Sequence, residues 1–302
     1  MSTVLIILKQ IVVMFLIMGM GYILFKKKLI TKDGSKTLAN LLIYIILPCV
    51  IINGFIKERT PERIAQLGVS ALLALVFLII SALVSRLIFK KSPIDNFAAC
   101  FSNPGFFGIP LIVAAYSSEA VFYITAFIAF LNIGQWTYGA AVLKEEKVKV
   151  NFKTIFTSPF IIGLIIGLVI FFTQIPLPTV ITSTIGAACN ANTFIAMLVL
   201  GTYLAQTDLK SMFLTPKLYL LSFVRLALIP FICALSMLVM PESYRELCTC
   251  VMIACACPVG ANVAVYAQLY GKDYGYAVQT VTLSTIFSLA SIPLVLMVLN
   301  LM

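Results

Sequence analysis

Asn103-Pro104-Gly105-Phe106-Phe107-Gly108-Ile109-Pro110 interrupts an otherwise apolar run of this chain. A second break, Cys257-Pro258-Val259-Gly260-Ala261-Asn262, interrupts a later apolar run. Proline and glycine split a helix, and a lipid-embedded backbone cannot leave the freed N–H and C=O groups unpaired. Such breaks are tolerated where protein packs around them or where they meet a water-filled cavity. Matching breaks in two halves of a chain point to the binding site of a transporter.

The composition around the breaks is that of an integral membrane protein. Of the 302 residues, 62% are hydrophobic and 11% are charged, against about 25% charged in a typical soluble domain. Apolar runs of about 20 residues recur along the chain, as membrane-spanning helices require. The net charge of +10 comes almost entirely from short loops between these runs. We therefore expect the lipid bilayer as a partner, and no nucleic acid.

The apolar runs predict ten spans, at about 4–25, 36–56, 65–89, 95–116, 120–143, 154–174, 180–206, 216–240, 245–270 and 274–300. Of the 21 Lys and Arg residues, fifteen lie in the odd-numbered loops and four in the even-numbered ones. Basic loops face the cytoplasm. This bias places the odd loops inside and both termini on the extracytoplasmic side of the plasma membrane.

The most charged connection, residues 144–153, divides the chain into two sets of five spans, 1–143 and 154–302. Because five is odd, the second set must enter the membrane in the opposite sense. The expected fold is therefore an all-α membrane domain of two inverted five-helix repeats. The breaks fall in the fourth and ninth spans, where the two broken helices are expected to cross.

Each break creates half-helix ends with distinct electrostatics. The N-terminus of the outer half-helix carries partial positive charge and unpaired N–H groups, which suit an anion such as a carboxylate. Asn103 and Asn262 add neutral amides beside these ends. The C-terminal ends of the inner halves expose carbonyls that suit a cation or water.

The string from Asn103 to Pro110 with Leu111, together with Pro258 to Asn262, resembles the auxin efflux carrier family and its bacterial members. Pro48 and the Gln135-Trp136-x-Tyr138 segment also look like family features. The resemblance implies a five-plus-five inverted repeat with an elevator-like or rocking movement. It implies organic-anion substrates: indole acetate in plants, and malate, malonate and similar carboxylates in bacteria. Bile-acid sodium symporters are distantly similar.

Carried over position by position, the resemblance implies substrate-binding residues at both breaks and in the fifth span. These are Asn103, Pro104, Gly105, Gly108, Pro110, Gln135, Pro258, Gly260 and Asn262. The chain departs from the plant proteins in its short central loop. It also has Asn192-Thr193 where relatives often have a proline in the seventh span.

Other polar residues inside spans are secondary candidates: Asn53, Asn132, Asn192 and Arg225. Arg225 either snorkels to the interface or acts as a counter-charge for a dicarboxylate. No cofactor or metal is expected. Since Asp95, Glu119, Asp208 and Asp273 fall near span ends, coupling to Na⁺ or H⁺ is undecided.

The leading interpretation is a carrier of small mono- or dicarboxylates. One alternative is a sodium-coupled symporter of bile-acid type for a larger amphipathic anion, and another is a sensor that binds without transporting. The chain has no histidine and no embedded aspartate pair, so we expect no enzyme such as an intramembrane protease. The oligomeric state is open, with a homodimer as one option.

Overall fold

The computed structural model describes residues 3–144 and 152–301, and every regular element in these ranges is a helix. The first range contains α1 (Thr3–Lys26), α2 (Lys32–Leu41), η1 (Leu42–Ile46), α3 (Leu47–Phe55), α4 (Pro61–Ile88), α5 (Pro93–Cys100), η2 (Pro104–Gly108), α6 (Ile109–Ala115), η3 (Ser118–Ile124), α7 (Thr125–Gly134), η4 (Gln135–Gly139) and α8 (Ala140–Lys144). The second contains α9 (Phe152–Phe156), α10 (Pro159–Thr173), α11 (Thr179–Gln206), α12 (Leu209–Phe213), α13 (Pro216–Phe223), η5 (Val224–Leu228), α14 (Ile229–Leu235), η6 (Glu242–Tyr244), α15 (Arg245–Ala256), α16 (Asn262–Leu269) and α17 (Tyr274–Leu301).

Seven helical stretches in the described ranges are long and apolar enough to cross a membrane. They are Val4–Lys26, Lys32–Phe55, Pro61–Ile88, Ser118–Lys144, Thr179–Gln206, Pro216–Leu235 and Tyr274–Leu299. The other expected spans are split into shorter helices, two of them at the sequence breaks. The chain is thus a multi-pass membrane protein, while the ten-span inverted repeat stays a prediction. The predicted domain division at 144–153 falls mostly on residues 145–151, outside the described ranges.

Several spans widen locally just before a proline. The π-helical segments η1, η2 and η5 end at Ile46, Gly108 and Leu228. Pro48, Pro110 and Pro230 follow two residues later in each case. Proline removes an N–H and pushes away the carbonyl four residues before it, and one wider turn accommodates this clash without breaking the helix. Prolines therefore kink these spans instead of ending them.

Glycines allow close packing between α1 and α11 and between α10 and α3. A Cβ on Gly21 of α1 would collide with the backbone of Leu198 in α11, and a Cβ on Gly201 would collide with the backbone of Met18. A Cβ on Gly163 of α10 would lie 3.0 Å from Pro48 Cα. Without side chains at these positions, the helix backbones approach directly.

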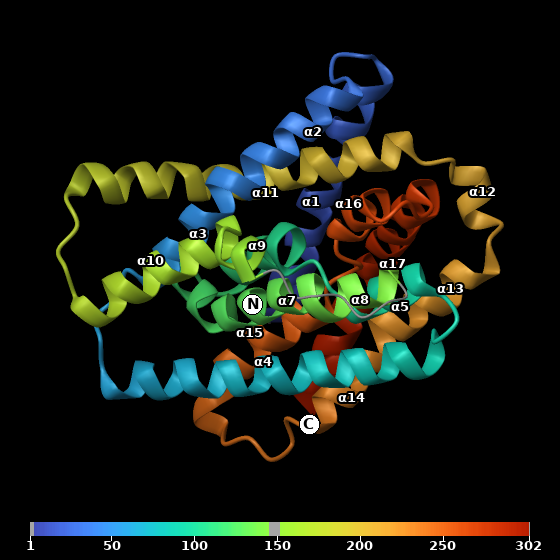
Figure 1. Cartoon of the computed structure of the whole chain (residues 1–302). Coiled ribbons are helices and arrows are strands. Elements are labelled where there is room, and N and C mark those ends of the chain that lie inside the picture. Colours follow the sequence, from blue (N-terminus) through green and yellow to red (C-terminus); the bar gives the residue numbers. More distant parts are fainter. Residues whose placement is uncertain (1–2, 145–151, 302) are drawn as a thin grey trace.

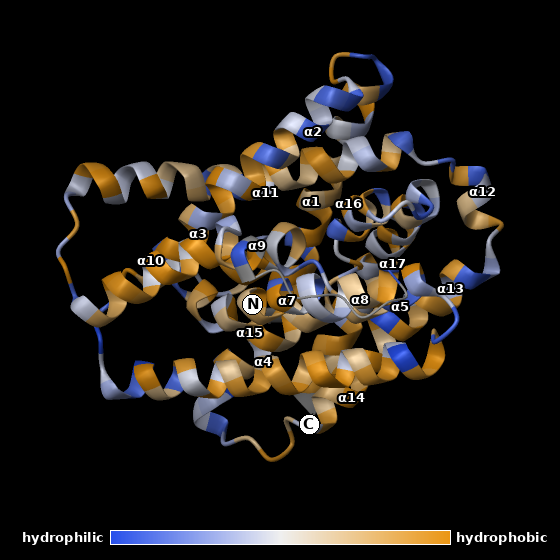
Figure 2. Cartoon of the chain, viewed as in Figure 1, coloured by the Kyte–Doolittle hydropathy of each residue, from blue (hydrophilic) through white to orange (hydrophobic). Residues whose placement is uncertain are grey.

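The long helices α4 and α11 run along opposite borders of the view in Figure 1, with the labels of α5, α7, α8 and α15 between them. Hydrophobic residues cover α4 and α10, whereas hydrophilic ones gather in the connections near α2, α12 and α13 (Figure 2). This distribution is the one expected of helices embedded in lipid with polar loops at their ends.

Candidate functional site

The first break lies between α5 and η2. Residues 101–103 are not helical, and Asn103 is buried at the start of the following helix. Its side-chain Oδ1 accepts a hydrogen bond from the Phe106 N–H at 3.4 Å, so Asn103 caps the outer half-helix. Its Nδ2 is buried without a partner among the described residues. Pro104 occupies the first helical position, where its missing N–H costs nothing.

The second break lies between α15 and α16 and contacts the first directly. Ser102 and Val259 form an isolated antiparallel bridge. The Gly260 N–H donates to the Phe101 carbonyl at 2.9 Å, and the Val259 N–H donates to Ser284 Oγ at 3.0 Å. Backbone groups freed by one break are thus paired by the other break and by α17. We call residues 101–103 and 257–261 the paired breaks.

Glycines at the paired breaks make room for a neighbouring backbone or side chain. A Cβ on Gly260 would lie 2.8 Å from the Ser102 carbonyl oxygen. A Cβ on Gly108 would lie 3.0 Å from Cys257 Sγ, and one on Gly105 3.3 Å from Leu47 Cδ1. Gly260 has the least room, because a backbone oxygen cannot rotate away as a side chain can.

Arg225 joins the half-helices that precede the breaks, α5 and α15. It is 1% exposed, so it does not snorkel. Its Nη1 donates to the Ala99 and Cys100 carbonyls at 3.0 and 3.3 Å, and its Nη2 donates to the Cys255 carbonyl. These carbonyls belong to the last turns of α5 and α15.

A cavity of about 580 Å³ reaches the half-helices that follow the breaks. Phe106, Ala261 and Asn262 contribute to its lining from the segments that follow the breaks. The Asn262 Nδ2 donates to Gln135 Oε1 at 2.9 Å, which leaves the buried Gln135 Nε2 without a partner among the described residues. The residue Gln135 thus lines the cavity, and its unpartnered amide donor is buried beside it.

The rest of the lining is a mixture of polar, aliphatic and aromatic residues, with charged residues at one end. Its aromatic residues are Tyr44, Phe106, Trp136, Phe160, Tyr203, Tyr266 and Tyr274. Trp136 and Tyr266 have ring centroids 5.0 Å apart. Exposed Lys32, Asp33 and Lys36 also line the cavity, so its mouth carries one excess positive charge among these residues.

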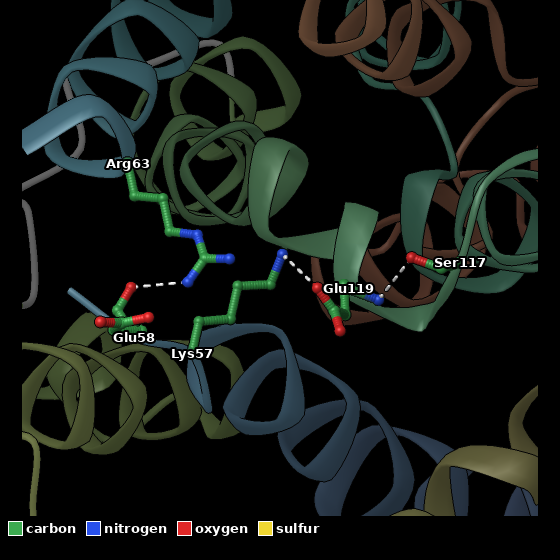
Figure 3. A network of polar contacts seen from close by, with 5 residues as sticks. All are labelled: Lys57, Glu58, Arg63, Ser117 and Glu119. Atoms are coloured by element: carbon green, nitrogen blue, oxygen red, sulfur yellow. Dashed lines mark hydrogen bonds and ion pairs between the residues drawn. The ribbon is translucent and has the colours of Figure 1, made fainter. Parts of the chain in front are cut away.

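An ion pair lies at the opposite end of the second span. Lys57 follows this span, whose 24 residues from Lys32 to Phe55 extend roughly 36 Å at 1.5 Å per residue. The Lys57 Nζ lies 3.4 Å from Glu119 Oε2, and the Glu119 N–H donates to Ser117 Oγ (Figure 3). Burial lowers the pKa of Lys57, and the charge of Glu119 opposes this shift.

An aromatic cluster lies under this ion pair. The Phe55 and Phe122 rings are 5.3 Å apart, and those of Phe122 and Phe171 are 5.4 Å apart. The Lys57 Nζ stands 5.4 Å from the Phe122 ring centroid. Nearby, Arg63 donates to the Glu58 carbonyl at 2.7 Å (Figure 3). The cavity thus opens toward Lys32, while packed rings and an ion pair cover the end at Lys57.

The structure separates the predicted site residues into groups. Gln135, Asn132 and Asn262 line the cavity, and the Asn132 Nδ2 donates to the Ile128 carbonyl at 2.8 Å. Asn103 and Arg225 lie at the breaks but are not among the described lining residues. Asn53 and Asn192 are also not among the described lining residues. Asn53 is half-buried, and Asn192 is buried with no partner for its amide in the described ranges.

Several cavity residues lie outside the site predicted from the sequence, namely the aromatic residues, Lys32 and Lys36. Asp95 was placed near a span end and does lie in the first turn of α5, yet it is fully buried. Its carboxylate lies 2.7 Å from Lys217 Nζ and accepts from the Tyr276 hydroxyl at 2.6 Å. Because the basic partner of Asp95 lies over 100 positions away in the sequence, no local pattern predicts that this acid is buried.

Comparison with known proteins supports the membrane assignment. No curated relative matches the chain. A family model described as membrane transport protein matches residues 6–296, almost the full length. The chain therefore belongs to this family of membrane transporters, the auxin efflux carrier family.

Proposed function

We propose that the protein is a secondary transporter of small organic anions, mono- or dicarboxylates, that binds them beside Gln135 and Asn262. The observation that carries this proposal is the buried, unpartnered Gln135 Nε2 beside the cavity. A buried donor left unsatisfied costs about 1–3 kcal/mol. A carboxylate oxygen would accept this hydrogen bond and remove the cost.

The surroundings of this amide also favour an anion. The cavity reaches the N-terminal ends of η2 and α16, where helix dipoles place partial positive charge. Lys32 and Lys36 at the mouth would attract anions from solution. A volume of about 580 Å³ lies within the usual range of small-molecule sites.

One-sided access supports a carrier cycle. Access from the Lys32 end and closure at the Lys57 end describe one endpoint of alternating access around a fixed site. The loop charges place the Lys32 end in the cytoplasm, so this endpoint would be inward-facing, with both termini outside the plasma membrane.

Counterflow in proteoliposomes tests the proposal. Vesicles loaded with each member of a carboxylate panel, malate and malonate included, should accumulate the same labelled acid from outside. Gln135→Leu should raise the KM about tenfold, since it removes the donor, while the distant, partly exposed Gln66→Leu should not. Saturable binding without counterflow would favour a sensor. The absence of both binding and counterflow would refute the proposal.

A further inference from the structure

Arg225 is the largest fully buried side chain of the described residues, and it carries a full charge. In the described ranges no carboxylate lies within ion-pair distance of it. Its guanidinium instead contacts three backbone carbonyls, those of Ala99, Cys100 and Cys255. A buried charge with only neutral partners needs another source of stabilisation.

The half-helices that precede the two breaks, α5 and α15, supply that stabilisation. The last carbonyls of a helix have no partner within the helix, and its C-terminus carries roughly half a negative charge. The three carbonyls belong to the C-terminal turns of α5 and α15. Two such ends together offer about one negative charge, which matches one guanidinium.

The planar guanidinium suits this task better than a point charge. Its fixed fork directs Nη1 toward α5 and Nη2 toward α15, so a single side chain joins two helices from different parts of the sequence. Arg225 sits in η5, where the widened turn precedes Pro230.

We propose that Arg225 is a resident cation, which fills the position where the carbonyl ends of two broken helices would otherwise hold an exchangeable ion such as Na⁺. It is a positioning residue, because it touches the helix ends beside the paired breaks and does not line the cavity. By neutralising the carbonyl ends, it leaves the positive N-terminal ends of η2 and α16 uncompensated. The cavity beside them then favours an anion without a bound coupling cation at this position.

Chemical rescue tests this role. Arg225→Ala should lower the melting temperature in detergent by about 5 °C or more, because three buried carbonyls lose their partner. Millimolar guanidinium, far below denaturing concentrations, should restore much of this loss in the variant and leave the wild type unchanged. Tetramethylammonium, which donates no hydrogen bond, should not rescue. Exposed Arg86→Ala is the matched control and should melt like the wild type.

Two further measurements keep the inference testable if Arg225→Ala does not fold. The wild-type melting temperature should be equal in sodium and choline buffers, and Arg225→Lys should melt between the wild type and the alanine variant. Sodium-dependent stabilisation of the wild type, or a lysine variant as stable as the wild type, would overturn the inference.

The anion preference rests on the proposed function, whereas the melting experiments do not. Rescue by guanidinium together with absent carboxylate counterflow would refute the proposed function and leave the resident cation standing. Counterflow without rescue by guanidinium would refute the resident cation and leave the proposed function standing.

Discussion

At the scale of single residues, the paired breaks depend on the absence of a side chain at Gly260. The Gly260 N–H bonds to Phe101, and its Cα faces the Ser102 carbonyl oxygen. Any larger residue would separate the two breaks. The half-helix ends that depend on this contact would then shift.

Gly260→Ala should therefore reduce carboxylate counterflow at least tenfold, because its Cβ would lie 2.8 Å from a backbone oxygen. Overpacking of this kind costs about 1–3 kcal/mol. Gly186→Ala in α11 is the control, since its Cβ would meet no atom within 4 Å. Equal transport by both variants would show that the breaks tolerate separation.

The amino-acid sequence predicts part of this residue-level picture. Asn262 and Gln135 were selected from the second break and the family resemblance, and the structure places them in hydrogen-bond contact. The contact of Arg225 with α5 and α15 was not predicted. Its partners are main-chain carbonyls about 125 and 30 positions away. Every residue has such a carbonyl, so no residue type in the sequence marks these partners.

At the scale of helices, glycine positions decide which helices touch closely. Gly21 and Gly19 both lie in α1, but only Gly21 faces α11. Helix boundaries agree with the predicted apolar runs because length and hydropathy are local properties. Packing partners depend on which face of a distant helix lies opposite, and this is not a property of one sequence segment.

Gly21→Ala should lower the melting temperature in detergent, since its Cβ would collide with the Leu198 backbone. Gly19→Ala should be neutral or slightly stabilising, because alanine favours helix by up to about 1 kcal/mol and its Cβ would meet nothing within 4 Å. A thiol-reactive dye reports melting through buried cysteines such as Cys233 and Cys250. Equal melting of the two variants would contradict close contact of α1 and α11.

At the scale of the whole molecule, the described residues place the cavity mouth at the Lys32 end and an ion pair over packed rings at the Lys57 end. The closure combines the aromatic cluster of Phe55, Phe122 and Phe171 with the ion pair of Lys57 and Glu119. Lys57 has a nearly buried side chain, whereas that of Glu119 is 66% exposed. Such a half-exposed pair contributes about 1 kcal/mol or less, a strength suited to an end that must open during transport.

Glu119→Gln should loosen this end. Hydrogen–deuterium exchange in η3 should rise a few-fold, in keeping with the loss of about 1 kcal/mol. Glu58→Gln is the matched control: Glu58 is the neighbouring acid, and its contact with Arg63 runs through the carbonyl, which the substitution keeps. Unchanged hydrogen–deuterium exchange in η3 of the Glu119 variant would show that the ion pair does not hold this end together.

The most direct test of the anion site is the dissociation constant of a transported carboxylate for wild type, Asn262→Asp and Gln66→Glu. Asn262→Asp keeps the shape of the side chain and adds a negative charge inside the cavity, whereas Gln66→Glu adds the same charge on the distant α4. Like charges about 5 Å apart repel by roughly 3 kcal/mol at an effective dielectric constant of about 20. Asn262→Asp should bind the carboxylate at least tenfold more weakly, and Gln66→Glu should bind it unchanged. Wild-type affinity in Asn262→Asp would contradict an anion site beside this residue.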